Sequence, residues 1–214
     1  MLVSMLVPPL CWACGGVARR REPLCSGCRG VLRRLGPDPV LLCGVPVWAP
    51  VAYAGPARDL VRALKFRGAS AVADAMAAQI AANAPAELLG LARVPAAASR
   101  PVLVPVPLHP RRLRRRGYNQ AALIAAALAR RTGLELADCL ARTGSAATQV
   151  GRDRSERRAG PGGSVELRAP LPERVVLVDD VATTGATLAA CAAPARTGGA
   201  CDVTAVVFAR TIGR

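Results

Sequence analysis

The stretch Val175–Thr187, which reads Val-Val-Leu-Val-Asp-Asp-Val-Ala-Thr-Thr-Gly-Ala-Thr, decides the fold. Four apolar residues in succession predict a strand over Val175–Val178 that is covered on both faces, as strands of a parallel sheet are. Two carboxylates end this run, small and hydroxyl residues follow, and Leu188–Ala195 has the composition of a helix. The segment therefore predicts a strand–loop–helix unit of an α/β domain.

The loop of this unit has the features of an anion site. Gly185 can take a positive φ, and the small residues around it let the backbone approach a ligand closely. Thr183, Thr184 and Thr187 add hydroxyl donors. The loop opens onto a helix, whose free N–H groups and positive dipole end point toward a bound anion.

The two carboxylates suit a different part of the same ligand. Asp179 and Asp180 match ribose hydroxyls, or a Mg²⁺ ion that is held mainly through water. The alternative is an ordinary acidic cap at a helix start. Only one of two adjacent aspartates can cap, however, and the other then needs a partner or water.

The acidic pair followed by Thr-Thr-Gly resembles the signature of the type I phosphoribosyltransferases. This resemblance implies that Asp179 and Asp180 hold the ribose 2- and 3-hydroxyls of 5-phosphoribosyl 1-pyrophosphate and form the catalytic pair. It also implies that the loop cradles the 5-phosphate. The candidate phosphate- and ribose-binding residues are Val181, Ala182, Thr183, Thr184, Gly185, Ala186 and Thr187.

Two Cys-x-x-Cys pairs lie near the N-terminus and predict a structural metal site. They are separated by ten residues, and two such pairs close a tetrahedral shell of four thiolates around Zn²⁺. The alternatives are two disulfides or reduced surface thiols. Cys43 has no partner for a second such site, since the position three residues earlier is Val40. The predicted zinc ligands are Cys11, Cys14, Cys25 and Cys28.

A second strand–loop–helix unit carries a strongly basic loop. Pro101–Pro107 predicts a short strand, His109–Gln120 holds five arginines, and a helix is expected over Gln120–Arg131, capped by Asn119. Arginine pairs bind a diphosphate with directional hydrogen bonds. The candidate pyrophosphate-binding residues are Arg111, Arg116 and Lys65. A solvated basic loop or a nucleic-acid patch is the alternative reading of the same residues.

The composition bounds the class of protein. A chain of 214 residues fits one domain with a small appendage. We expect residues 1–46 to form a zinc-ribbon-like N-terminal domain and linker, and residues 47–214 an α/β domain. The formal net charge is +15, with Lys65 as the only lysine; an anionic partner or an arginine-rich genome composition would each explain it. No segment is long and apolar enough for a membrane span, so a cytoplasmic protein with mostly reduced or metal-bound cysteines is expected.

The remaining segments complete the predicted order of elements. Strands are expected over Val47–Ala54 and Asp202–Phe208, and helices over Ala57–Phe66 and Ser70–Ala84. Residues 144–163 form a long polar loop, which is either an active-site lid or disordered. The order predicts a parallel sheet flanked by helices, with ligand loops at the carboxyl ends of the strands.

Taken as a whole, the chain resembles the ComF/GntX family. The resemblance implies a zinc ribbon joined to a type I phosphoribosyltransferase-like fold, and an association with DNA uptake during natural competence. Two functions follow: an enzyme that transfers a phosphoribosyl group with Mg²⁺, or a module that binds single-stranded DNA and docks competence or DNA-processing proteins. The motifs behind it are the four cysteines, Tyr53-Ala-Gly55 with Arg58, Leu64-Lys65-Phe66, Val104-Pro-Val-Pro107, Arg116-Gly-Tyr-Asn-Gln120, Arg142-Thr143, Thr148-Gln149, Glu156-Arg157 and Asp179–Thr187.

Overall fold

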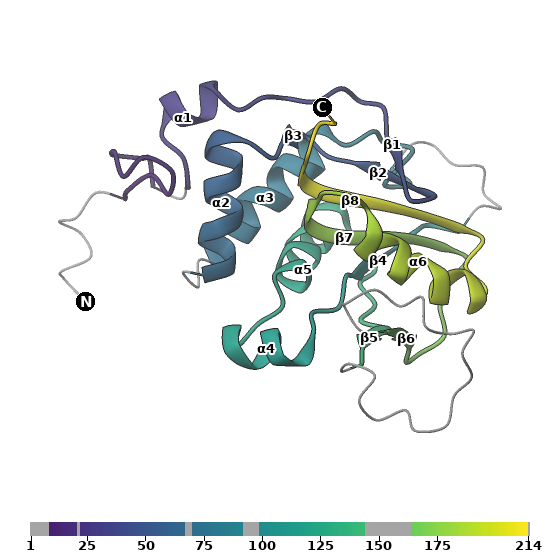
Figure 1. Ribbon diagram of the computed structural model, residues 1–214. Coiled ribbons are helices and arrows are strands. Elements are labelled where there is room, and N and C mark those ends of the chain that lie inside the picture. Colours follow the sequence, from purple (N-terminus) through teal and green to yellow (C-terminus); the bar gives the residue numbers. More distant parts are fainter. Residues whose placement is uncertain (1–8, 21, 67–69, 92–98, 144–163, 214) are drawn as a thin grey trace.

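A mostly parallel, six-stranded sheet forms the centre of the molecule (Figure 1). The structure is a computed structural model, and it describes residues 9–20, 22–66, 70–91, 99–143 and 164–213. The strand order is β1-β2-β8-β7-β4, with β3 also paired to β8, and only β1 runs antiparallel to its neighbour. A separate antiparallel pair is formed by β5 and β6.

Groups of one to three strands alternate with one or two helices along the described chain. The helices are α1 (Ser26–Gly30), α2 (Gly55–Phe66), α3 (Ser70–Asn83), α4 (Pro110–Arg116), α5 (Gln120–Thr132) and α6 (Ala186–Thr197). The strands are β1 (Val40–Leu42), β2 (Val45–Trp48), β3 (Val51–Ala52), β4 (Val102–Pro105), β5 (Leu140–Arg142), β6 (Val165–Leu167), β7 (Arg174–Ala182) and β8 (Asp202–Arg210).

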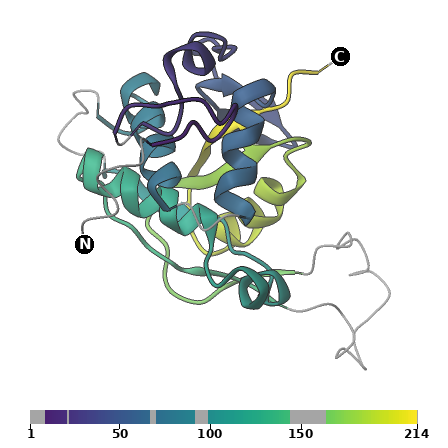
Figure 2. The same cartoon turned by 90° about the vertical axis from the view of Figure 1, so that its left-hand side faces the viewer.

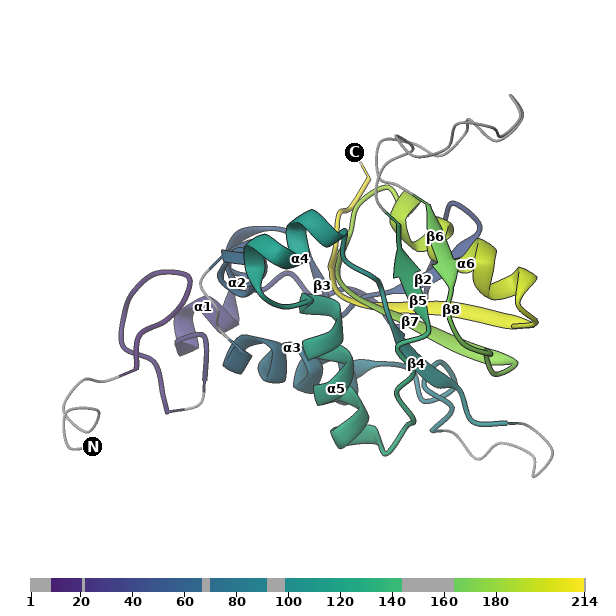
Figure 3. The same ribbon diagram turned by 90° about the horizontal axis from the view of Figure 1, so that it is seen from below.

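Side chains of β7 and β8 alternate between two apolar cores, one on each face of the sheet. Val176 and Val178 pack with α2, α3 and α5, whereas Val175 and Leu177 pack with α6 and β5. Figures 1 and 3 show these two layers on opposite sides of the sheet. Burial on both faces explains why the sequence of β7 is continuously apolar, and the predicted α/β fold class is confirmed.

The N-terminal cysteine module packs against the same core as α2 and α3. Cys11, Ala18 and Leu24 are buried together with residues of these helices, and Trp12 lies partly buried against them. In Figure 2 this module lies beside α2, on the helical side of the molecule. The division of the chain at residue 46 stays a prediction; the sheet itself begins before that point, at β1 and β2. None of the described helices has the length and hydropathy needed to cross a membrane.

Two local expectations were wrong. The decisive strand does not end at Val178, because the ladder with β8 continues through Asp179 to Ala182. The predicted basic loop contains the helix α4, which His109 caps by accepting a hydrogen bond from the Arg111 N–H. The segment of residues 29–46, expected as a linker or a ribbon remnant, contains β1, which pairs with β2 in a hairpin. The predicted lid at residues 144–163 lies outside the described residues.

Candidate functional site

The two aspartates lie near the C-terminal end of β7, at the carboxyl edge of the sheet. Asp180 is 3% exposed, and Asp179 is partly buried. Neighbouring side chains of a strand point to opposite faces. Accordingly, Asp180 forms an ion pair with Lys65 from α2. Asp179 faces α6, where its charge contributes to the raised pKa of Cys191. The Oδ1 atom of Asp179 also accepts a hydrogen bond of 2.8 Å from the Asp180 N–H.

Basic residues from α2 and from the end of α4 converge on Asp180, and aromatic residues link these two segments. The Lys65 Nζ lies 3.0 Å from Asp180 Oδ2. The Arg116 guanidinium lies over the Phe66 ring, with its carbon 5.3 Å from the ring centroid, a cation–π contact. The Tyr118 hydroxyl donates to the Leu64 carbonyl and so ties the end of α2 to the start of α5. The structure thus brings together two of the three candidate pyrophosphate residues, Lys65 and Arg116.

Burial governs the protonation of the acidic pair. Burial, together with the negative charge of Asp180, raises the pKa of Asp179 to about 8. Burial also raises the pKa of Asp180, although the Lys65 ammonium and the Arg116 guanidinium oppose this shift. Burial in turn lowers the pKa of Arg116. Such perturbed groups gathered at one strand end are typical of functional sites.

Replacing Lys65 by methionine is expected to destabilise the fold by about 3 kcal/mol, because it leaves the Asp180 carboxylate buried without its counter-ion. Urea unfolding at pH 7 measures the loss. The double variant Lys65→Met/Asp180→Asn should recover most of it, since no charge then remains buried. Equal stability of Lys65→Met and wild type would show that the ion pair does not hold Asp180.

A short bend at residues 183–185 joins β7 to α6 and forms the candidate phosphate loop. Thr183 and Thr184 are exposed, and α6 begins without a side-chain cap. Thr184 Oγ1 accepts a long hydrogen bond of 3.4 Å from the Ala186 N–H. Beyond the Ala186 N–H, the first turn of α6 therefore offers backbone N–H groups to an anion, next to a bend that carries threonine residues.

The β1–β2 hairpin supports this loop from one side. Gly185 has a φ of +84°, as predicted, and a Cβ atom there would lie 2.5 Å from the Leu42 Cβ. The Cys43 Sγ–H donates to the Thr184 carbonyl at 3.2 Å, and Arg196 of α6 donates to the Gly44 carbonyl at 2.9 Å. The loop is thus held by contacts that its own sequence does not specify.

The substitution Gly185→Ala should destabilise the protein by about 3 kcal/mol. The left-handed backbone costs an alanine about 1 kcal/mol, and the clash with Leu42 adds about 2 kcal/mol. Gly133→Ala is the matched control, because Gly133 also has a positive φ but nothing within 4 Å of the added Cβ. Urea unfolding of both variants isolates the cost of the clash; equal losses would mean that the hairpin does not press on the loop.

The third candidate pyrophosphate residue, Arg111, lies apart from the buried cluster. Arg111, Arg112, Arg114 and Arg115 are all exposed on α4, whereas Arg116 at its end is partly buried. Gly117 ends the helix with a φ of +79°, and Asn119 caps α5 by accepting from the Ala121 N–H at 3.1 Å. The predicted cap at Asn119 is therefore confirmed.

The four predicted zinc ligands form one cluster. Their sulfur atoms all lie within 4.8 Å of one another, and Cys14 Sγ and Cys25 Sγ are 3.7 Å apart. Four sulfurs at about 2.3 Å from a tetrahedral zinc are about 3.8 Å apart, so the spacing fits this ion. The N–H groups of Gly16 and Cys28 point at Cys14 Sγ and Cys25 Sγ. The cluster could hold a structural zinc ion, with no position left open for catalysis.

Sequence reasoning assigned no role to Phe66, Tyr118 or Leu42. The first two lie inside motifs that carry the family resemblance, and that was the only signal for them. Leu42 gave no signal, because its contact with Gly185 joins segments that are far apart in the chain.

The fold and the site together define a class: a type I phosphoribosyltransferase-like α/β protein with a four-cysteine module at its N-terminus. No model of a known protein family matches the chain. The chain is 32% identical to DNA utilization protein YhgH of Escherichia coli (strain K12) over 162 residues. These residues make up 75% of this chain and 70% of the relative. The same holds for DNA utilization protein YhgH of Shigella flexneri. Competence protein F of Haemophilus influenzae is 40% identical over 91 residues, or 40% of each chain. The chain belongs to the ComF family.

Proposed function

We propose that this chain binds 5-phosphoribosyl 1-pyrophosphate with Mg²⁺ at the carboxyl edge of β4 and β7 and transfers the phosphoribosyl group to an acceptor. One observation carries the proposal: two adjacent carboxylates near the end of β7 are followed, across a bend of residues 183–185, by a helix start whose N-cap residue Gly185 offers no side-chain cap and which has three threonines around it. The loop suits the 5-phosphate, and the carboxylates suit the ribose hydroxyls.

The basic cluster supports a diphosphate site on the other side of the ribose. Lys65 and Arg116 are the cations that interact with Asp180, and they come from α2 and from the end of α4. In transfer, the bond between ribose C1 and the diphosphate oxygen breaks as the acceptor bonds to C1. Lys65 and Arg116 would stabilise the negative charge of the departing diphosphate. Binding of the donor would then exchange the Lys65–Asp180 ion pair for contacts to the donor.

Mg²⁺ fits this site as an ion that arrives with the donor. Among the described residues, the only group of three or more close metal-ligating side chains is the cysteine cluster, so the acidic pair does not form a cage of its own. Diphosphate oxygens and water would supply most ligands. The chemistry that the ion supplies when bound is neutralisation of the leaving group.

A thermal-shift series with fragments of the donor tests the two halves separately. Thr184→Val should reduce the shift caused by ribose 5-phosphate and spare that caused by Mg²⁺-pyrophosphate. Arg116→Gln should do the reverse, and Arg168→Gln, an exposed arginine outside the site, should change neither. If neither fragment nor donor raises the melting temperature of zinc-loaded protein at millimolar concentration, the proposal fails.

A second candidate function is binding of single-stranded DNA, and the exposed arginines of α4 favour it. The names of the relatives, DNA utilization protein and Competence protein F, point to DNA uptake and to partners in that process. Cytoplasmic placement fits the eight cysteines, which all lie within the described residues and form no disulfide there.

Oligothymidylate binding should then weaken steeply with salt. Each lost phosphate contact lowers the slope of log K against log [salt] by about 0.7, so Arg112→Gln/Arg115→Gln should lower it by about 1.4. Fluorescence anisotropy at KCl concentrations from about 50 to about 300 mM would measure the slope of log K against log [salt]. An unchanged slope would remove α4 as the binding surface.

A further inference from the structure

The antiparallel pair β5–β6 lies along α6, on the opposite side of the sheet from α2 and α3. At one end, Leu167 of β6 packs closely on the end of α6, because a Cβ atom at Gly198 would lie 2.5 Å from the Leu167 Cδ2. Arg142 of β5 lies nearer to the start of α6, since its positive charge opposes the rise in the pKa of Cys191. The β5–β6 pair therefore leads from the end of α6 toward the candidate phosphate loop.

The side chain of Arg142 lies on the side of this pair that faces α6. Side chains alternate along a strand, so Arg142 shares a face with Leu140, which is buried in the same core as α6. The cross-strand partner of Arg142, Val165, also packs against that core. Glu166 lies opposite Ala141 in the ladder and is therefore on the other face. The guanidinium is thus directed toward α6 and away from the carboxylate on its own strand pair.

The Arg142 guanidinium holds a buried donor that has no acceptor. Its Nε atom is buried and makes no hydrogen bond. Within the described ranges of the chain, Arg142 also forms no ion pair. A buried N–H group without an acceptor costs stability, and the cost is larger on a charged group. An oxyanion would satisfy this donor with a charge-assisted hydrogen bond.

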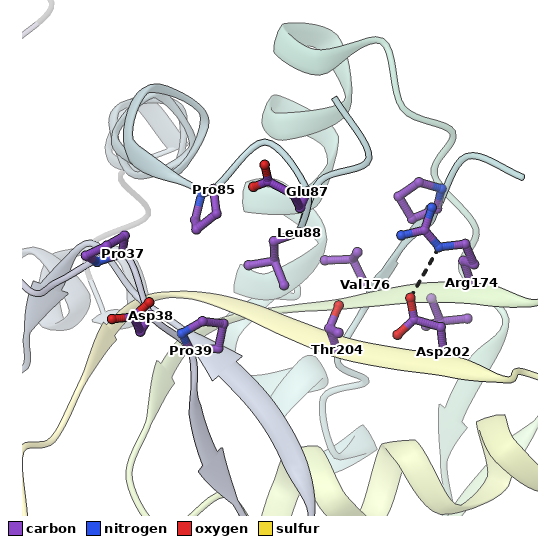
Figure 4. A pocket seen from close by; sticks show the side chains of 12 residues that line it. Pro37, Asp38, Pro39, Pro85, Glu87, Leu88, Arg174, Val176, Asp202 and Thr204 are labelled. Carbon is purple, nitrogen blue, oxygen red and sulfur yellow. Dashed lines mark hydrogen bonds and ion pairs between the residues drawn. The ribbon is translucent and has the colours of Figure 1, made fainter. Parts of the chain in front are cut away.

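Arg174 shows how a structural arginine of this fold is satisfied. It lies at the start of β7, in the lining of a cavity at the amino edge of the sheet, and its Nε donates to Asp202 Oδ2 at 3.2 Å (Figure 4). A terminal nitrogen of Arg174 donates to the Ser99 carbonyl, also at 3.2 Å. Both arginines are half-buried at a strand end. Only the Nε of Arg174 has an acceptor among the described residues, so packing alone does not explain an arginine at position 142.

The side of α6 near Arg142 leads to the candidate phosphate loop. Thr187 and Cys191 are four residues apart, so they lie on the same side of α6, about 6 Å apart along its axis. The charge of Asp179 reaches the same cysteine from β7. The threonine of the loop, the carboxylate that suits the ribose and the Arg142 guanidinium therefore border one region at the start of α6.

We propose that Arg142 is a phosphate-binding residue, which completes the subsite of the 5-phosphate from the β5–β6 side. The inference rests on the proposed function and adds a residue to it. Arg116 lies on the Asp180 side of β7 and takes the diphosphate, whereas Arg142 lies on the Asp179 side and takes the 5-phosphate. One arginine on each face of the central strand would thus bind each charged end of the donor.

Calorimetric titrations of ribose 5-phosphate and of Mg²⁺-pyrophosphate into the full-length, zinc-loaded protein test the inference. Arg142→Gln should bind ribose 5-phosphate at least about tenfold more weakly, because hydrogen bonds to a charged group are lost, and should bind Mg²⁺-pyrophosphate as wild type does. Its melting temperature should not fall, because the buried Nε–H has no acceptor to lose. Arg174→Gln is the matched control: it should lower the melting temperature by breaking its ion pair and keep full affinity for ribose 5-phosphate.

Failure of this inference and failure of the proposed function give different results. Wild-type affinity for ribose 5-phosphate in Arg142→Gln would overturn the inference alone, and so would a loss confined to Mg²⁺-pyrophosphate. The inference is also overturned if the wild type does not bind ribose 5-phosphate at millimolar concentration. If the wild type binds ribose 5-phosphate through Arg142 but binds neither Mg²⁺-pyrophosphate nor the complete donor, the proposed transfer fails and the inference stands.

Discussion

Loss of one zinc ligand should lower the melting temperature of the whole protein, not only unfold the N-terminal module. Cys11 and Leu24 are buried in the same core as α2 and α3, so unfolding of the module uncovers these helices. Structural zinc contributes about 10–16 kcal/mol in isolated zinc-finger peptides. If the loss of zinc lowers the free energy of unfolding of the whole chain by only about 3 kcal/mol, the melting temperature falls by about 10 °C in a domain of this size.

Cys25→Ser is the variant of choice, because Cys25 both belongs to the cluster and caps α1. Scanning calorimetry and elemental analysis should show a lower melting temperature together with loss of bound zinc. Cys201→Ser, an exposed cysteine far along the chain, should retain both. A wild-type protein that contains no zinc, or that melts unchanged after chelation, would contradict a structural zinc site.

Asp179→Asn should raise stability, and the gain should grow with pH. Burial places the pKa of Asp179 at about 8 in the folded protein, against about 3.9 when unfolded. The folded state then holds its proton more tightly, so wild-type stability falls as pH rises from about 4 to about 8. Asparagine resembles the protonated acid, and its Oδ1 can still accept from the residue-180 N–H.

Urea unfolding at about pH 5, 7 and 8.5 measures the difference in the free energy of unfolding between Asp179→Asn and wild type. We expect Asp179→Asn to be more stable than wild type by about 1.5 kcal/mol at the lowest pH, which is about one unit above the unfolded pKa, and the difference to grow by about 2 kcal/mol or more at the highest, since one pKa unit is about 1.4 kcal/mol. Asp138→Asn, at an exposed position, should keep the wild-type slope. Parallel pH profiles for Asp179→Asn and wild type would show that folding does not raise the pKa of Asp179.

Asp179 lowers stability and yet lies near the end of the central strand β7. Such destabilising residues are typical of binding sites, where function and stability make opposite demands. The same variant should therefore bind the phosphoribosyl donor less well while it unfolds less easily. Opposite effects of one substitution on stability and on binding separate a functional carboxylate from a structural one.

The sequence predicts local features of the site well. The burial of Val175–Val178, the positive φ of Gly185 and the cap at Asn119 all depend on neighbours within a few residues. The helix α4 was missed because its arginines suggested a loop. Pro110 at its start and Gly117 at its end are nevertheless standard boundary signals, so this helix was predictable.

Contacts between distant segments were not predictable from one sequence. The Tyr118–Leu64 bond spans 54 positions, and the Cys43–Thr184 bond spans 141. The strand extends past Val178 because β8 supplies a partner for Asp179, which composition alone does not reveal. These contacts set the depth of the acidic pair and the shape of the loop.

Calorimetric titration of 5-phosphoribosyl 1-pyrophosphate into zinc-loaded protein, with and without Mg²⁺, tests the central claim most directly. We predict one site per chain, tighter binding with Mg²⁺, and at least tenfold weaker binding by Asp180→Asn than by Glu166→Gln. No heat in the wild type at millimolar donor, together with an unchanged melting temperature, would contradict it.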